Sequence, residues 1–296
     1  MYGAVIGDIV GSKYEHHNLK SKDFPLFDPL FCKVTDDSLM TEAVAGALLL
    51  PPEKRNWTDP AVLELVSKRV VSTMRAIGVE FFLADFGTRF RKWLLSEHHL
   101  PYGSHGNGAP MRVSPVAYAA NTLDECKALS RAVTEVTHNS DEAIHGAEAV
   151  AVAIFLARTG KSKEEIRQHI VENYYPLDTT LDELRPRYFF CPATKKTVPP
   201  AMLAFFESTD FEDAIRNAIS VGGDSDTIAA ITGSIAEAYY GIPEAILIQA
   251  MDYFSAEQLA KLKFSTPEYR MRFHHQPPEY LREFYREYNV PNPLDK

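Results

Sequence analysis

Residues 35–50 read TDDSLMTEAVAGALLL, a pattern typical of a helix with one apolar face. The four polar residues at its start are good helix caps, and Pro51 and Pro52 stop the helix at its other end. The apolar positions with helical spacing are Leu39, Met40, Ala43, Val44, Ala47 and Leu48. The stretch therefore predicts a helix that packs its apolar face against a core.

Helical patterns of this kind recur along most of the chain. Further helices are predicted over residues 59–78, 139–160 and 226–241, each closed by a glycine. No segment alternates apolar and polar residues for long enough to predict a strand. We therefore predict a compact all-α fold.

Nothing in the sequence divides this fold into parts. It contains no Ser/Gly-rich linker, charge block, low-complexity tract or internal repeat. We therefore predict a single domain over residues 1–296. Residues 175–200 are rich in proline and poor in helical periodicity, and we predict a long ordered loop there.

The composition is that of a soluble globular protein, and it limits the partners. The 296 residues are 45% hydrophobic, and 31 Lys and Arg against 40 Asp and Glu give a formal net charge of -9. No apolar run approaches the roughly 18 residues of a membrane-spanning helix. The negative charge argues against bulk binding to DNA or RNA, although a small anion could bind at one local site.

The start of the chain and its cysteines predict a cytoplasmic location. Asp8 interrupts the first apolar stretch and no basic segment precedes it, which is unlike a secretory signal. Cys32, Cys126 and Cys191 are widely spaced, so we expect neither a disulfide framework nor a structural zinc site. A reduced, cytoplasmic compartment fits this use of cysteine.

Two short acidic clusters stand at the starts of predicted helices: residues 35–38 (TDDS) and residues 222–227 (GGDSDT). Helix capping alone could explain either cluster. Four carboxylates exceed what two caps require, however, and crowded carboxylates need a compensating cation. Their oxygen atoms are hard ligands that suit Mg²⁺, Mn²⁺ or Ca²⁺. If the two helix starts converge, they could hold two divalent ions.

A glycine-rich loop, residues 103–112 (GSHGNGAPMR), is a candidate anion site. Backbone N–H groups beside a helix N-terminus attract anions, the next helix is expected to begin near Ser114, and Arg112 could add positive charge. The alternative is a plain flexible turn.

Three further features are candidates for roles in a site. Gly3, Gly7 and Gly11 recur every four residues, so they line one helix face and permit close packing against another helix. Glu15 follows this face and could reach a pocket, although by itself it reads as a surface acid. His138 lies just before a predicted helix, where loops often face a site.

Taken together, these elements resemble the ADP-ribosylglycohydrolase family over nearly the whole chain. That family includes the dinitrogenase reductase-activating glycohydrolase and the ADP-ribosyl-acceptor hydrolases. The matching segments, in the family's order, are GAVIGDIVGSKYE (3–15), TDDS (35–38), GNGAPMR (106–112), TH (137–138), TVPPA (197–201) and GGDSDT (222–227). Each motif alone is common, whereas all six in order are specific.

The resemblance implies an all-α, ADP-ribosylglycohydrolase-like fold with a centre of two Mg²⁺ (or Mn²⁺) ions. It implies hydrolysis of the glycosidic bond at C1″ of an ADP-ribosyl group, releasing ADP-ribose from a modified protein or other acceptor. The implied metal ligands are Thr35, Asp36, Asp37, Asp224, Asp226 and Thr227. The implied substrate-binding residues are Gly106, Asn107, Gly108, Met111, His138 and Gly223, and the implied catalytic residues are Glu15, Asp36 and Asp37.

The chain departs from the family's pattern in two places. Only nineteen residues separate Glu15 from Thr35, and Ala109-Pro110 replaces the more usual pair of small residues, so we expect different substrate-shaping loops. Two other functions stay open: a metal-dependent hydrolase of a free nucleotide or sugar phosphate, and a non-catalytic binding, structural or regulatory relative. The intact carboxylate set argues against the second. The acceptor, the choice between Mg²⁺ and Mn²⁺, and the oligomeric state also stay open.

Overall fold

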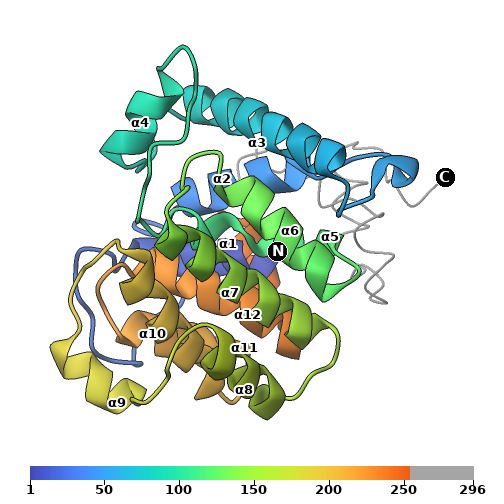
Figure 1. Cartoon of the computed structure of the whole chain (residues 1–296). Helices are drawn as coiled ribbons and strands as arrows, with labels where there is room; N and C mark the ends of the chain where they lie inside the picture. Colours follow the sequence, from blue (N-terminus) through green and yellow to red (C-terminus); the bar gives the residue numbers. More distant parts are fainter. Residues whose placement is uncertain (254–296) are drawn as a thin grey trace. The chain divides into compact units, whose positions relative to one another are not determined.

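The structure is a computed structural model, and it describes residues 1–253. This part contains thirteen α-helices and no β-strand, so the predicted all-α fold is confirmed (Figure 1). It forms one compact unit. Residues 254–296 lie outside the described part, and a single domain over residues 1–296 therefore stays a prediction. No helix in residues 1–253 is long and apolar enough to cross a membrane.

The helices of the described part have the following bounds. The α-helices are α1 (Tyr2–Ser12), α2 (Asp36–Ala47), α3 (Pro60–Glu80), α4 (Thr88–Leu94), α5 (Ser114–Ala119), α6 (Leu123–Thr134), α7 (Asp141–Arg158), α8 (Lys163–Asn173), α9 (Leu181–Leu184), α10 (Thr194–Phe206), α11 (Phe211–Ser220), α12 (Ser225–Tyr240) and α13 (Glu244–Met251). Three short 3-10 helices are η1 (Pro52–Lys54), η2 (Pro110–Arg112) and η3 (Arg185–Arg187).

Most predicted helix starts agree with the structure, but two predicted ends do not, because α2 already ends at Ala47, before Pro51, and α3 does not end at Gly78. Asp59 caps α3, because its side chain accepts a hydrogen bond from Ala61 N. The helix nevertheless continues past Gly78 to Glu80. A Cβ at Gly78 would lie 2.7 Å from Leu94 Cδ2, so this glycine allows a close helix contact and does not end the helix.

The predicted loop over residues 175–200 is wrong at its end, because α10 contains Pro199 and Pro200. Each proline lacks the N–H that would bond to the carbonyl four residues earlier. The carbonyl of Lys196 loses its partner at Pro200, but it accepts a hydrogen bond from the Tyr188 hydroxyl at 3.0 Å. A tertiary contact thus replaces one missing bond inside the helix.

The contact between α1 and α12 lies in the middle of the fold (Figure 1). Gly3, Gly7 and Gly11 pack closely against another helix, as their spacing predicts, and that helix is α12. The backbones are so close that a Cβ at Gly7 would lie 2.0 Å from the carbonyl oxygen of Ala229. A Cβ at Gly11 would lie 2.5 Å from Asp226 Cα. The glycine face therefore fixes the first turn of α12 against the end of α1.

Replacing Gly7 by Ala is expected to lower the free energy of unfolding by about 1–3 kcal/mol, the usual cost of overpacking. The added methyl group meets backbone, which cannot move aside. Gly46 in α2 is the matched control, because among the described residues a Cβ there would meet only Thr73 Cγ2, at 3.9 Å. The Gly46→Ala variant should be neutral or gain up to about 1 kcal/mol from helix propensity. Urea denaturation measures both, and equal losses would refute the packing role.

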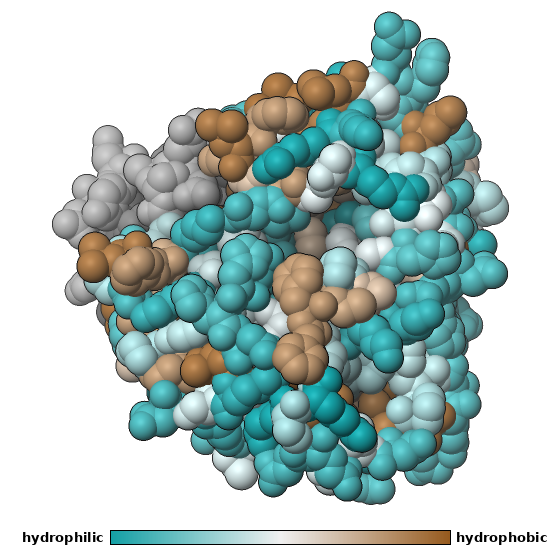
Figure 2. Space-filling view, turned by 90° about the vertical axis from the view of Figure 1, so that its left-hand side faces the viewer, coloured by the Kyte–Doolittle hydropathy of each residue, from teal (hydrophilic) through white to brown (hydrophobic). Residues whose placement is uncertain are grey.

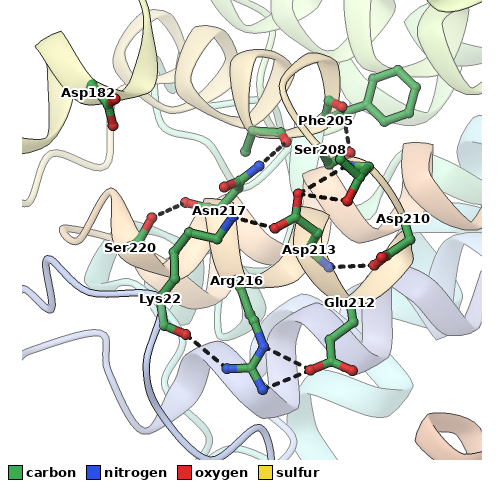
Figure 3. Close-up of polar contacts among 12 residues, drawn as sticks. Lys22, Asp182, Phe205, Ser208, Asp210, Glu212, Asp213, Arg216, Asn217 and Ser220 are labelled. Atoms are coloured by element: carbon green, nitrogen blue, oxygen red, sulfur yellow. Dashed lines mark hydrogen bonds and ion pairs between the residues drawn. The ribbon is translucent and has the colours of Figure 1, made fainter.

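Helix α11 anchors the segment that connects α1 to α2 (Figure 3). Asp210 caps α11 by accepting a hydrogen bond from Asp213 N at 2.8 Å. Arg216 Nη1 donates to the backbone oxygens of Lys22 at 2.9 Å and Phe24 at 2.7 Å. The Lys22 ammonium also forms an ion pair with Asp213. The connecting segment is therefore held to the body of the fold by both charge and hydrogen bonds.

Candidate active site

The structure brings the two acidic clusters together at the N-termini of α2 and α12. The Thr227 hydroxyl donates to Asp37 Oδ2 at 3.3 Å, which links one cluster directly to the other. Two groups of three carboxylates each offer oxygen atoms within 4.8 Å of one another: Asp8, Asp37 and Asp226 in the first, and Glu15, Asp224 and Asp226 in the second. Asp226 belongs to both groups.

Helix geometry explains where these carboxylates lie. Asp36 and Asp37 occupy the first turn of α2, after the cap residue Thr35. Asp224 directly precedes α12, and Asp226 occupies its first turn. The positive end of each helix dipole favours negative side chains at these positions.

Asp8 is a site residue that the sequence analysis did not assign. Its Oδ1 accepts a hydrogen bond from Thr35 Oγ1 at 2.6 Å, and its Oδ2 accepts from the backbone nitrogens of Thr35 at 3.0 Å and Ser38 at 3.1 Å. The Ser38 hydroxyl donates to the same carboxylate. Asp8 therefore holds the start of α2 against α1. The signal for this role was one acid within the otherwise apolar stretch GAVIGDIV.

Burial and mutual repulsion raise the pKa values of the clustered aspartates. Desolvation is the largest cause at Asp36, whose pKa rises to about 7, and the charges of Asp8 and Asp224 add to it. The pKa values of Asp37 and Asp226 also rise, first through desolvation and then through the charges of neighbouring carboxylates. The ionised cluster is therefore unfavourable by itself, and a positive charge among the carboxylates would stabilise it.

The chemistry of the cluster fits hard divalent ions such as Mg²⁺ or Mn²⁺. Its side chains offer carboxylate and hydroxyl oxygens only. Asp37 Oδ1 is buried and makes no hydrogen bond within the described residues, which leaves an acceptor that a cation would satisfy. The six predicted ligands all belong to this region: Thr35, Asp36, Asp37, Asp224, Asp226 and Thr227.

The glycine loop joins the second acidic cluster through Asn107. Asn107 Nδ2 donates to Asp224 Oδ2 at 2.7 Å and to Thr197 Oγ1 at 3.1 Å. Met111, which the motif also implies as a substrate-binding residue, lies in η2 with a buried side chain. Thr197, which the sequence analysis named only as part of a motif, therefore contacts the candidate site through Asn107.

The segment after α1 folds over the turn at Gly222 and Gly223. Both glycines have φ of +74°, a conformation that other residues rarely adopt. The backbone N–H of Gly223 donates to Asn18 Oδ1 at 3.1 Å. Glu15, on the same segment, lies close to Asp224. Burial and then the charge of Asp224 raise the pKa of Glu15.

His138 lies against the glycine loop from the other direction. A Cβ at Gly108 would lie 3.2 Å from Cε1 and Nε2 of His138, and a Cβ at Gly106 would lie 3.9 Å from Nε2. The ring is buried. Burial and then the charges of Arg112 and Arg89 hold its pKa well below the ordinary value, so the ring is neutral at pH 7.

Two exposed aromatic residues lie beside the acidic site. Phe189 and Phe190 are 64% and 50% exposed. The ring centroid of Phe190 is 6.2 Å from that of His16, the residue after Glu15. A Cβ at Gly223 would lie 3.3 Å from the backbone carbon of Phe189. Figure 2 shows the face that carries residues 13–34 and α9, where apolar side chains lie next to a hollow in a hydrophilic surface.

The sequence profile of the ADP-ribosylglycohydrolase family matches residues 1–271. The chain belongs to this family. The human ADP-ribosylhydrolase ARH3 is 28% identical over an alignment of 318 positions, which covers 82% of this chain and 84% of the human protein. The ADP-ribosylarginine hydrolase Tri1 of Pseudomonas putida (strain GB-1) is 30% identical over 148 residues, or 46% of this chain and 39% of that protein.

A solved structure described as an ADP-ribosylglycohydrolase-related protein complex has the same fold. It matches with a TM-score of 0.63 at 22% identity, over 91% of this chain and 95% of that one. The resemblance inferred from the six motifs is thereby confirmed. As a member of the ADP-ribosylglycohydrolase family, the protein is a glycohydrolase-type hydrolase.

Proposed function

We propose that this protein cleaves the glycosidic bond at C1″ of ADP-ribosyl groups and releases ADP-ribose from a modified protein or other acceptor, with two Mg²⁺ (or Mn²⁺) ions as cofactors. The observation that carries the proposal is the set of carboxylates that share Asp226, joined to the glycine loop through Asn107 and Asp224. The family match and the two ADP-ribosylhydrolase relatives support the class of reaction.

The proposed metal-binding residues are Thr35, Asp36, Asp37, Asp224, Asp226 and Thr227, with Asp8 and Glu15 completing the two carboxylate groups. Bound divalent ions would supply positive charge that polarises the hydroxyls of the distal ribose and a water molecule. Asp8 contributes in a second way, because it fixes the first turn of α2 through Thr35 and Ser38.

The glycine loop is the proposed site for the pyrophosphate. Gly106 N–H already donates to Ser104 Oγ at 3.1 Å, so the N–H of Gly108 and the ring of His138 are the better candidate donors. Local donors of this kind allow a protein of net charge -9 to bind an anionic ligand.

In the proposed reaction, the bond between C1″ and the acceptor atom breaks, and the acceptor leaves with the bonding electron pair. Positive charge develops on the ribose ring, as in other glycoside hydrolysis, and the clustered carboxylates stabilise it. Glu15 takes a proton from the water whose oxygen forms the new bond to C1″, and that proton is returned to the departing acceptor, so the two hydrogens of the water end on ADP-ribose and on the acceptor. The products are ADP-ribose and the unmodified acceptor.

The candidate acceptors are arginine, serine, a nucleic-acid base and a small metabolite. One relative is named for ADP-ribosylarginine, but its match spans only 46% of this chain. The exposed ring of Phe190 lies against His16, the residue after Glu15, so it is a candidate contact for an acceptor. The cytoplasmic location stays a prediction from the sequence.

The test is to incubate the protein and Mg²⁺ with a panel of ADP-ribosylated acceptors and to follow free ADP-ribose by mass spectrometry. We expect release from at least one acceptor and none after chelation with EDTA. If no acceptor yields ADP-ribose, the proposed reaction is wrong, and the phosphate-ester alternative would be tested next with free nucleotides.

ADP-ribose itself is expected to bind and to raise the melting temperature, since a ligand selective for the native state stabilises it by about 2.7 kcal/mol at 100 times its Kd. Asn107→Ala should weaken this effect, because it frees the loop from Asp224 and Thr197. Asn173→Ala is the control, because within residues 1–253 that exposed side chain donates only to His169 O of the same helix, α8. Thermal shift and titration calorimetry measure both, and equal behaviour of the two variants would argue against the loop as the ligand site.

A further inference from the structure

A chain of hydrogen bonds runs from Arg112 through Thr137 to the ring of His138. Arg112 Nη2 donates to Thr137 Oγ1 at 2.8 Å, and the same oxygen lies 2.7 Å from His138 Nδ1. Arg112 Nη1 donates to the carbonyl oxygen of Gly108. Arg112, Thr137 and His138 are all buried. The chain therefore begins and ends at the glycine loop.

The donors and acceptors in this chain decide which ring nitrogen of His138 carries the hydrogen. The guanidinium of Arg112 can only donate, so Thr137 Oγ1 accepts from it. The hydroxyl hydrogen of Thr137 then needs an acceptor, because a buried hydroxyl seldom leaves its hydrogen unpaired. Within the described residues, His138 Nδ1 is the acceptor that this hydroxyl reaches. Nδ1 is therefore the unprotonated nitrogen, and the neutral ring carries its hydrogen on Nε2.

The Nε2 side of the ring faces the glycine loop. His138 Nε2 makes no hydrogen bond within residues 1–253, and it borders the two positions, Gly106 and Gly108, that lack side chains. Burial, and then the nearby charge of Arg112, lower the pKa of the ring and oppose a second proton on it. His138 thus presents one fixed N–H donor beside the loop.

We propose that Arg112 and Thr137 are positioning residues that fix His138 as an Nε2–H donor toward a phosphate oxygen of a ligand bound at the glycine loop. The fixed tautomer follows from this chain's own contacts. Its use in binding ADP-ribose rests on the proposed function, so each part has its own measurement.

Nuclear magnetic resonance of protein labelled with ¹⁵N-histidine tests the tautomer. We expect His138, assigned with a His138→Gln variant, to show a protonated Nε2 and an unprotonated Nδ1. A hydrogen on Nδ1 in the wild type would overturn the assignment. This measurement uses the wild-type protein, so it decides the point even if a Thr137 variant fails to fold.

Two substitutions at Thr137 test the positioning role. Thr137→Val removes the hydroxyl at nearly constant volume, and it should produce a mixture of tautomers, whereas Thr137→Ser should keep the wild-type spectrum. Thr134→Val is the matched control, because Thr134 is also buried but its Oγ1 makes no hydrogen bond within the described part. A single unchanged tautomer in Thr137→Val, or an equal disturbance in Thr134→Val, would refute the role of Thr137.

Titration calorimetry with ADP-ribose tests the ligand contact. Thr137→Val should weaken binding in proportion to the fraction of rings that lose the Nε2–H tautomer, about twofold for an equal mixture and about tenfold when one ring in ten keeps it. Thr137→Ser and Thr134→Val should bind as the wild type does. If ADP-ribose does not bind the wild type, the proposed function fails, and inorganic pyrophosphate replaces it as the probe of the donor. Wild-type affinity in Thr137→Val, or no binding of either probe to the wild type, would overturn the proposed contact.

Discussion

The Asp226→Asn variant is expected to lose divalent-ion binding and to lower ADP-ribose release to the background rate. Asp226 is the carboxylate common to both groups in the site, so its charge would serve an ion in either. Asparagine keeps the shape and can still accept the hydrogen bond from Thr227 N, which is 2.9 Å long in the wild type. The loss should therefore come from the missing charge. Elemental analysis and mass spectrometry of released ADP-ribose are the measurements.

The stability of the same variant should depend on metal in a characteristic way. In EDTA it should unfold at a higher temperature than the wild type, because one buried, repelled carboxylate is gone. In saturating Mg²⁺ the order should reverse, because only the wild type gains the full binding energy. Asp182→Asn, at a carboxylate 91% exposed and paired with Arg185, should follow the wild type in both conditions. A variant destabilised equally with and without Mg²⁺ would point to a structural role for Asp226.

The sequence did not predict that the two acidic clusters converge. It predicted only that they could hold ions if they did. Capping and apolar periodicity are local, and they located the starts of α2 and α12 well. The contact that brings the two starts together is not local. The spacing of Gly3, Gly7 and Gly11 indicated a close helix partner, but nothing in that spacing names α12 as the partner.

The role of Asp8 was not predicted, and the start of α10 was predicted to be a loop, for a related reason. Asp8 lies in the middle of a helix, where no capping rule applies, and its partner Thr35 is 27 residues away. Proline usually ends a helix, yet α10 contains Pro199 and Pro200. The Tyr188 hydroxyl replaces one of the backbone N–H donors that the prolines lack. In both cases a side chain from elsewhere in the fold satisfies a group that local reasoning leaves unpaired. The opposite holds for Gly106 and Gly223. Local reasoning leaves their backbone N–H groups free for a ligand, but these groups already donate to Ser104 and Asn18.

Glu15→Gln is expected to lower turnover by roughly 10² to 10⁴, the usual contribution of a positioned acid or base. Glutamine keeps the shape of the side chain but cannot take a proton from water. The segment that carries Glu15 is held in place, because Asn18 accepts from Gly223 N and Lys20 Nζ donates to Tyr188 O at 2.6 Å. The affinity for ADP-ribose should therefore change little. Rates with a saturating substrate measure turnover, and calorimetry with ADP-ribose measures the affinity.

Metal content distinguishes a role of Glu15 as proton acceptor from a role as ion ligand. Glu15 offers an oxygen to the group that contains Asp224 and Asp226, so it could act as an ion ligand instead of a base. If Glu15 accepts the proton, Glu15→Gln should have normal ion content and slow turnover. If Glu15 is an ion ligand, ion content and turnover should fall together. Glu142→Gln is the matched control, because the Glu142 side chain is 22% exposed against 21% for Glu15 and contacts His105 and Lys195. Near-normal turnover in Glu15→Gln, or an equal loss in the control, would remove Glu15 from the reaction and leave the buried aspartates to activate the water.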